Sequence, residues 1–257
     1  MKDSYKGESP GKKLARAKTW SVISMHLGAK LRAGGKIVVL ASREGGDIAT
    51  LSGLGVPQSS IVAVDRNAEA AAACRERWGS VEVRVGDAFE ITEKLGKKVV
   101  AAFFDLCGPL DGSACMGFTR VARRLPRDAI LAVAGMRGHE RNIVIKRYAE
   151  QARERETRAI AHYKDHGEDI EGAGMDLYRI RAVQDHLKRT LTGIRVGPIC
   201  LGVFNYQSNT RESHGVPMTI GIFELQRGDL FEREDDWTRR MRYAESEAAH
   251  KYWAGDF

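Results

Sequence analysis

Three aspartates each end a short apolar segment, and carboxylates placed in this way are suited to binding a polar ligand or accepting a proton. They are Asp65, Asp87 and Asp105, and they end the segments 61–65, 81–87 and 99–105. If these segments are parallel strands, their carboxyl ends meet at one edge of a sheet, which is where open sheets bind ligands. A single aspartate in this position is equally compatible with a helix cap. It is the set of three that predicts a site.

A turn containing glycine follows the first apolar segment, 36–41, and reads Ser42-Arg43-Glu44-Gly45-Gly46-Asp47. Glycines there let backbone amides approach a ligand at a helix N-terminus. Asp65 lies 19 residues beyond Gly46, about where an acid that binds a ribose diol is expected. The turn lacks the G-x-G-x-x-G pattern of nicotinamide enzymes, and no Gly-Lys-Ser/Thr follows as in a Walker A loop.

The elements that position these residues alternate regularly. The predicted strands are 36–41, 61–65, 81–87, 99–105 and 129–134, and the predicted helices between them are 47–54, 68–78 and 88–95. This alternation indicates right-handed βαβ units and a parallel sheet covered on both faces. The later β-rich runs, 194–206 and 216–225, are joined by too few residues for a crossover helix, so they predict an antiparallel hairpin. The fold class is therefore α/β, a doubly wound, mostly parallel seven-stranded sheet.

Three parts are expected along the chain. Residues 1–35 form a basic N-terminal arm and a helix, with the first dozen residues flexible and the helix at 14–31. Residues 36–226 form one α/β domain, interrupted after the fifth strand by a polar helical insert at 137–190. Residues 227–257 form a charged helical tail.

This pattern resembles the Rossmann-like (class I) S-adenosylmethionine-dependent methyltransferases over about residues 36–226, and the terminal hairpin separates that family from the dehydrogenases. The resemblance implies S-adenosylmethionine as the cofactor. It implies that Glu44, Gly45, Gly46 and Asp47 lie beside the methionine moiety, Asp65 at the ribose hydroxyls, and Asp87, Ala88 and Phe89 at the adenine. Ser42, Arg66 and Asp105 complete the expected cofactor site. The first motif departs from the family's E/D-x-G-x-G-x-G, because Ser42, Arg43 and Glu44 occupy part of it.

By the same resemblance, Asp105-Leu106-Cys107-Gly108-Pro109-Leu110 stands where the family's catalytic fourth motif lies. Methyl transfer to nitrogen or oxygen needs positioning and a group that accepts or orients a proton, a role predicted for Asp105. Amino-methylating nucleic-acid enzymes carry Asp/Asn/Ser-Pro-Pro-aromatic there, of which this sequence shares the first residue, with Pro109 four positions later.

Cys107 is an alternative catalytic residue, as the nucleophile that cytosine-carbon methyltransferases add to a pyrimidine. Those enzymes place proline directly before the cysteine, whereas Leu106 precedes Cys107 here. A small buried packing cysteine is the favoured interpretation.

Charge points to the class of acceptor. The 257 residues carry 41 Lys and Arg against 34 Asp and Glu, a net charge of +7. Residues 1–35 hold eight bases and two acids, so +6 of this charge lies there and +1 in the remainder. DNA or RNA methylated on a base nitrogen is therefore the first hypothesis. A solvated helix face explains the charge equally well. A small-molecule acceptor and a binding module without catalysis also remain open.

Other classes of site are not indicated. The four cysteines form no C-x-x-C pair, which predicts reduced thiols and a cytoplasmic location rather than disulfides or zinc. His162 and His166 have helical spacing for two metal ligands, but no metal site is predicted. No signal peptide or membrane span is predicted. The sequence leaves the oligomeric state open.

Overall fold

The computed structural model describes residues 10–42, 44–109, 112–136, 196–208 and 216–227. Seven strands form one sheet in the order β3-β2-β1-β4-β5-β7-β6. The strands are β1 (Lys36–Leu40), β2 (Ile61–Asp65), β3 (Glu82–Val85), β4 (Val99–Pro109), β5 (Ile130–Met136), β6 (Val196–Ser208) and β7 (Val216–Arg227). Strands β1 to β5 are parallel, and β7 pairs antiparallel with both β5 and β6. The predicted mostly parallel sheet and its antiparallel hairpin are confirmed.

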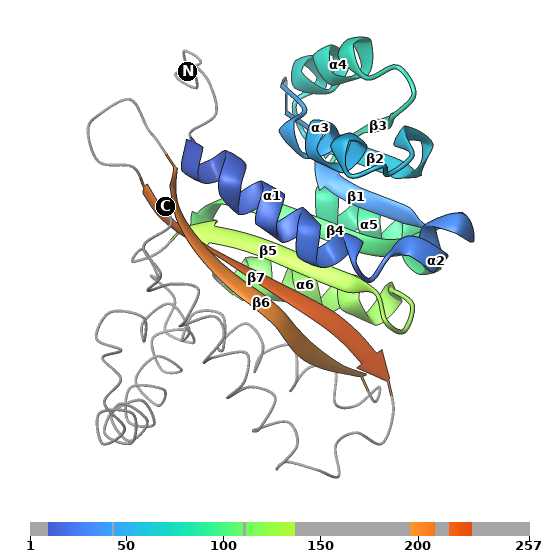
Figure 1. The fold of residues 1–257 in the computed structure, drawn as a ribbon, viewed down its shortest axis with the longest axis vertical. Helices are drawn as coiled ribbons and strands as arrows, with labels where there is room; N and C mark the ends of the chain where they lie inside the picture. Colours follow the sequence, from blue (N-terminus) through green and yellow to red (C-terminus); the bar gives the residue numbers. More distant parts are fainter. Residues whose placement is uncertain (1–9, 43, 110–111, 137–195, 209–215, 228–257) are drawn as a thin grey trace.

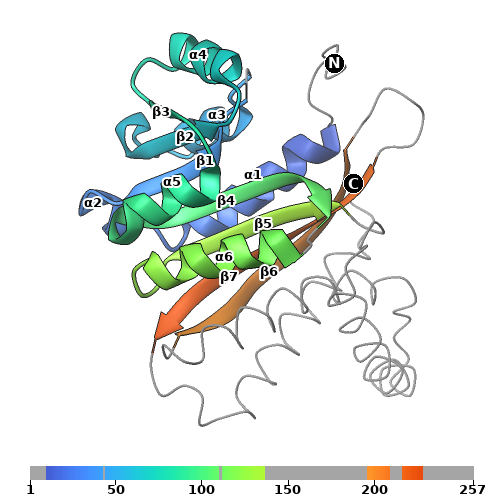
Figure 2. The ribbon, with the colours of Figure 1, turned by 180° about the vertical axis from the view of Figure 1, so that it is seen from behind.

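Helices cover both faces of the sheet. They are α1 (Pro10–Ser24), α2 (Gly28–Arg32), α3 (Gly46–Gly53), α4 (Ala68–Arg77), α5 (Ala88–Leu95) and α6 (Gly112–Arg124), with short 3-10 turns η1 (Gln58–Ser60) and η2 (Gly96–Lys98). Figure 1 shows α1 in front of the sheet, and Figure 2 shows α5 and α6 on the opposite face.

Alternating side chains along each strand build two cores, as expected of a sheet buried on both faces. Ile37 and Val39 pack into one hydrophobic cluster with Trp20 of α1, while Val38 packs into the other with Phe118 of α6. Successive β-branched residues of one strand are therefore buried alternately in the hydrophobic clusters on the two faces of the sheet.

The N-terminal region differs from its prediction. A helix begins at Pro10, where proline's missing N–H costs nothing because the first turn of a helix has no partner for it. The single helix expected at 14–31 is instead α1 and α2, separated by a turn. Trp20, Ile23 and Leu27 have no exposed surface. The expectation of a flexible arm is thus wrong from residue 10 onward, because α1 is held by the hydrophobic core.

One helix and two strand ends also differ from the prediction. Helix α6 was not predicted, although Ala114, Phe118, Val121, Ala122 and Leu125 are buried at helical spacing. Strand β4 continues past Asp105 to Pro109, and β3 ends at Val85, so Asp87 lies beyond the strand.

Several sequence predictions fall on residues outside this description. They concern the insert 137–190 with His162 and His166, the tail from residue 228, and residues 1–9. In the part of the chain that the structure describes, no helix has the length and apolar character of a membrane span. The same part contains no group of three or more metal-ligating side chains. Cys74 is a buried free thiol.

Candidate functional site

The strand order brings the predicted site residues to one edge of the sheet. β1 lies between β2 and β4, so the sequence order of the strands reverses beside it, and a crevice at the carboxyl ends is expected at such a point. Asp65 is the last residue of β2, and Asp87 lies two residues beyond the end of β3. Asp105 lies two residues beyond Phe103, which pairs with Val39 of β1. The three aspartates therefore lie along the edge onto which the glycine turn opens.

Asp65 shapes the turn between β2 and α4. Its Oδ1 accepts a hydrogen bond from the backbone N–H of Asn67 at 2.8 Å, and Asn67 in turn caps α4. The second oxygen, Oδ2, forms no hydrogen bond with a described residue. Asp65 is half-buried. One carboxylate oxygen thus holds the local fold while the other is available to a ligand.

Asp87 is the cap of α5, the role that a lone aspartate at this position was expected to allow. Its Oδ1 accepts from the N–H of Glu90 at 3.0 Å, and its Oδ2 accepts from the Arg66 guanidinium. Partial burial alone would raise the pKa of Asp87, but the hydrogen bonds from Arg66 and from the backbone hold it below its usual range. Arg66 itself is largely exposed.

The glycine turn is tight and is packed by side chains of this chain. Gly45 N–H donates to Ser42 Oγ at 3.0 Å, and Gly45 has the left-handed conformation, with φ of 62°. A Cβ at Gly45 would overlap the Trp78 indole, and one at Gly46 would overlap the Arg16 guanidinium. Both positions therefore need glycine for internal reasons. Glu44 of the same turn is exposed.

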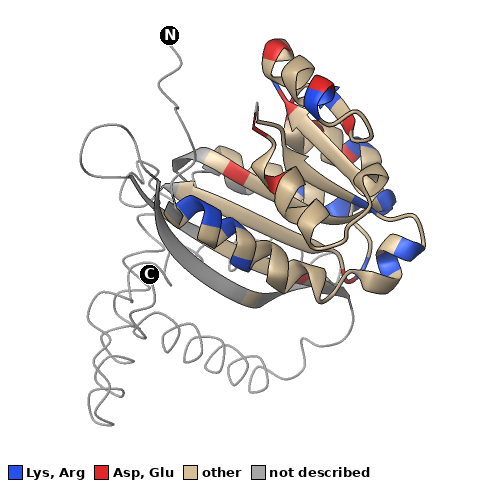
Figure 3. Ribbon diagram, turned by 45° about the horizontal axis from the view of Figure 1, so that its top comes forward, with Lys and Arg blue, Asp and Glu red and all other residues tan. Residues whose placement is uncertain are grey.

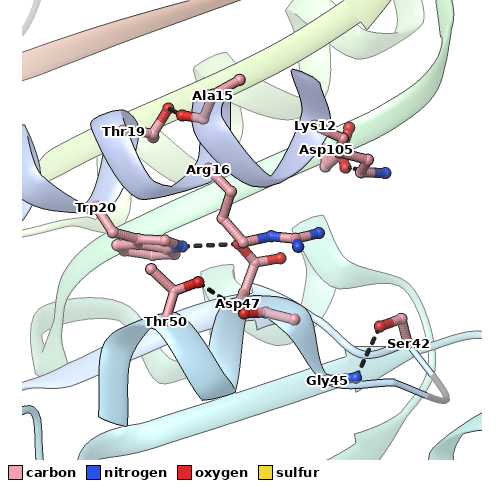
Figure 4. A network of polar contacts seen from close by, with 11 residues as sticks. Lys12, Ala15, Arg16, Thr19, Trp20, Ser42, Gly45, Asp47, Thr50 and Asp105 are labelled. Carbon is pink, nitrogen blue, oxygen red and sulfur yellow. Dashed lines mark hydrogen bonds and ion pairs between the residues drawn. The ribbon is translucent and has the colours of Figure 1, made fainter. Parts of the chain in front are cut away.

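Asp47 lies in a buried polar cluster rather than on an open surface (Figure 4). Its Oδ1 accepts from Arg16 Nε at 3.0 Å and from Trp20 Nε1 at 2.7 Å. Burial raises the pKa of Asp47, opposed by the charge of Arg16 and the hydrogen bond from Trp20. These contacts attach α1 to the first turn of α3. Arg16 and Trp20 were missed by sequence reasoning, since nothing in the spacing pairs them with Asp47.

Asp105, the predicted proton acceptor, forms an ion pair with Lys12 of α1. Lys12 Nζ lies 2.7 Å from Asp105 Oδ2, and the Asp105 side chain is 11% exposed. The charge of Asp105 raises the pKa of Asp47 and the charge of Lys12 lowers it. Asp47, Asp105, Lys12 and Arg16 therefore form one electrostatic cluster. Lys12 and Arg16 are two of the eight bases of residues 1–35 whose charge suggested nucleic acid or a solvated helix face, and both bind acids of this chain.

The remaining predicted residues are placed differently. Phe89 packs inside the molecule, its ring centroid 4.7 Å from that of Phe104 and 5.1 Å from that of Phe118. Ala88, half-buried, begins α5. The backbone of Cys107 lies in the irregular stretch of β4 between Asp105 and Pro109, and Pro109 pairs with Met136 of β5. The side chains of Cys107 and Pro109 lie outside the description.

A buried polar atom without a partner lies beside the glycine turn. The Nε1 of Trp78, a hydrogen-bond donor, is shielded from solvent and forms no hydrogen bond with any residue that the structure describes. Such atoms are rare in native proteins and often mark the position of a ligand or water. Trp78 Nε1 thus offers a hydrogen-bond donor beside the turn, and the second oxygen of Asp65 offers an acceptor at the end of β2.

Comparison with known proteins bears on the fold. No protein-family model matches the sequence, and no curated protein matches it. Trm1 from Pyrococcus horikoshii, solved with S-adenosyl-L-methionine, is similar with a TM-score of 0.53 and 13% identity. The match covers 92% of this chain and 58% of Trm1, so this chain spans little more than half of that protein's length. This likeness confirms the Rossmann-like class I methyltransferase fold.

Two further solved structures illustrate the range of proteins that the chain is similar to. An rRNA methylase from Streptococcus thermophilus matches at a TM-score of 0.42 and 16% identity, over 86% of this chain and 100% of its own. An O-methyltransferase from Bacillus cereus, in complex with SAH, matches at 0.42 and 12%, over 80% of each chain.

Proposed function

We propose that this protein is an S-adenosylmethionine-dependent methyltransferase whose acceptor is a base nitrogen of DNA or RNA. The observation that carries the proposal is the set of three aspartates along the carboxyl edge, beside the glycine turn at the reversal of strand order. A ligand with a diol, an aromatic base and charged groups needs hydrogen-bond acceptors, which the aspartates supply. It also needs backbone that can approach it closely, which the glycine turn supplies.

The residues present fit that cofactor. Asp65 Oδ2 would accept from the ribose hydroxyls, and Trp78 Nε1, which has no partner among the described residues, would supply a donor beside Gly45. Arg16, whose guanidinium lies against Gly46, would face the methionine carboxylate. Asp87, held ionised by Arg66 and the start of α5, would face the adenine end. When bound, the cofactor supplies a methyl group on a sulfonium centre.

Asp105 is the residue of this chain that would act on the acceptor. Its carboxylate is mostly buried and ionically paired, so an amino group that replaced Lys12 at Oδ2 would be oriented by a strong charge-assisted hydrogen bond. The amine nitrogen would form a bond to the methyl carbon as the carbon–sulfur bond of the sulfonium breaks and its electron pair stays on sulfur, and Asp105 would accept the proton that the amine loses. The carbonyl oxygens of the irregular stretch after Asp105 would accept further hydrogen bonds from the same amine.

The cofactor is tested by calorimetric titration of S-adenosylmethionine into the full chain. Asp65→Ala should weaken binding by about tenfold or more, because a hydroxyl of the ribose loses a charged acceptor. Glu76→Ala is the matched control, since Glu76 is an exposed acid of the adjacent helix α4, and it should bind as the wild type does. Equal binding by wild type and Asp65→Ala, or no binding by either, would overturn the proposal.

The acceptor is tested by mass spectrometry of nucleosides after incubation with cofactor and mixed DNA and RNA. The proposal is supported if a methylated base is found after incubation with the wild-type protein and is absent without it. Methyl transfer to small molecules alone would favour the small-molecule alternative, in which the positive charge has no role in catalysis. Cofactor binding without any transfer would favour a module that keeps the fold but lacks catalysis. A Cys107→Ser variant with full transfer would exclude a covalent route through that thiol.

A further inference from the structure

A second concentration of positive charge lies at the edge of the sheet opposite to Asp105. Its members come from α2, the start of β1, η2, the end of α6 and the turn between α6 and β5, and we call it the amino-edge basic surface. It comprises Lys30, Arg32, Lys36, Lys97, Lys98, Arg124 and Arg127. Figure 3 shows basic residues on α1 and again on α2, and Figure 1 shows that α2 lies where β1 begins.

Contacts between these segments hold the surface together. Lys36 pairs with Val99 in the sheet, which brings the start of β1 beside Lys97 and Lys98. The Lys30 side chain donates to the backbone oxygen of Asp128 at 2.5 Å, which joins α2 to the turn before β5. A Cβ at Gly96 would lie 3.7 Å from the backbone oxygen of Arg124, so η2 lies against the end of α6. Residues far apart in sequence thus form one surface.

Part of this charge is compensated within the chain. Lys30 pairs with Asp128 at 3.3 Å, Lys36 with Glu82 at 3.8 Å, and Arg124 with Glu93 at 3.6 Å.

The other four members behave differently. Arg32, Lys97, Lys98 and Arg127 are exposed and form no ion pair with any residue in the described ranges. Four like charges held on converging segments repel one another in the free protein, and an anionic partner would relieve that repulsion.

We infer that the amino-edge basic surface binds the phosphate backbone of a nucleic acid. Exposed lysine and arginine from several segments suit a polyphosphate, because each neutralised phosphate releases counterions. Protein interfaces, by contrast, are depleted in lysine. The inference rests on the proposed function for the role of the bound polymer as acceptor, but the binding itself needs neither cofactor nor methyl transfer.

The distance between the amino-edge basic surface and Asp105 sets a minimum size for a ligand that contacts both. The surface is separated from Asp105 by the length of the parallel strands, roughly 16 Å for the five residues of β1. A mononucleotide cannot reach both edges, whereas a folded or double-stranded nucleic acid can. The surface therefore binds a part of the polymer remote from the base at Asp105.

The test compares two pairs of charge reversals that change the net charge equally. Lys97→Glu/Lys98→Glu removes two unpaired members of the surface, and Lys13→Glu/Arg77→Glu removes two exposed bases of α1 and α4. Binding of an RNA hairpin and of a DNA duplex is measured by fluorescence anisotropy across a range of salt concentrations, without cofactor. Thermal unfolding checks that both variants fold, and Lys97→Arg/Lys98→Arg checks that charge rather than packing is responsible.

The amino-edge reversal should weaken binding by about tenfold or more and lower the slope of log affinity against log salt by about two. The control pair should lose less than about threefold, and the arginine pair should bind as the wild type does. Equal losses in both reversal pairs, or a wild-type preference for anionic lipid vesicles over nucleic acid, would overturn the inference. The cofactor titration that tests the proposed function is a separate measurement made without nucleic acid. A failure of this inference is therefore distinguishable from a failure of the proposed function.

Discussion

The Nε of Arg16 donates to the Oδ1 of Asp47 at 3.0 Å, and both side chains are less than a tenth exposed. The two residues are 31 positions apart. Through this pair, the first helix of the chain is attached to the turn that follows the first strand. The positive charge of the N-terminal region is therefore partly used within the molecule, at the edge where the cofactor is proposed to bind.

Removal of Arg16 should destabilise the protein strongly. Arg16→Met would leave the buried Asp47 carboxylate without its ionic partner, and breaking a buried pair from one side costs about 3–5 kcal/mol. Chemical denaturation measures this loss. Lys13→Met, on an exposed position of the same helix, should change stability by less than about 0.5 kcal/mol. Similar values for the two variants would show that the Arg16 contact contributes nothing.

The two glycines of the turn should tolerate alanine far less well than a glycine at the end of the next helix. Gly45→Ala places a Cβ in the left-handed region and against Trp78, and the backbone effect alone costs about 1–2 kcal/mol. Gly53→Ala meets nothing within 4 Å and should stabilise α3 by up to about 1 kcal/mol. Thermal unfolding should therefore shift in opposite directions, and a stabilising Gly45→Ala would contradict the packing described for the turn.

Asp105 should affect transfer more than cofactor binding. Asp105→Asn removes the proton acceptor and should lower the methyl transfer rate by about 100-fold or more. Lys12→Met removes the partner of Asp105 but leaves the carboxylate, so it should retain much more activity than Asp105→Asn. Single-turnover assays at saturating cofactor make the comparison, and equal losses in the two variants would argue against a direct role for Asp105.

The lowered pKa of Asp87 predicts a specific dependence of stability on pH. Because this carboxyl titrates lower in the folded chain than in the unfolded chain, its stabilising contribution is present above the unfolded pKa. It is lost as the pH falls through the folded value. Arg66→Gln removes the main favourable side-chain contact and should flatten the loss of stability below about pH 4.

Urea denaturation between neutral and acidic pH makes this measurement, with Arg77→Gln as the control. Arg77 is an exposed arginine of α4 that is not bonded to Asp87. If Arg66→Gln and Arg77→Gln followed the same curve, the Arg66 contact would not be the cause of the shift.

Most of the sheet could be predicted from the sequence because its signals are local. Short β-branched runs such as 61–65 alternate with helix formers, and the connection after β6 is too short for a crossover. Helix α6 carried an equally local signal in the spacing of Phe118, Val121 and Leu125. The irregular continuation of β4 past Asp105 had no such signal, since it depends on pairing with β5.

By itself, the sequence determined the alternation of β1 to β5 with α3, α4 and α5 and the gathering of the three aspartates at the carboxyl edge of the sheet, because both follow from residue type and spacing along the chain. Only the tertiary structure decided what those acids contact. Asp47 and Asp105 acquire Arg16 and Lys12 as partners, and the unpaired bases of the amino edge gather from three segments. The physical reason is that an ion pair depends on distance in space, which packing of α1 on the sheet sets and no local pattern encodes.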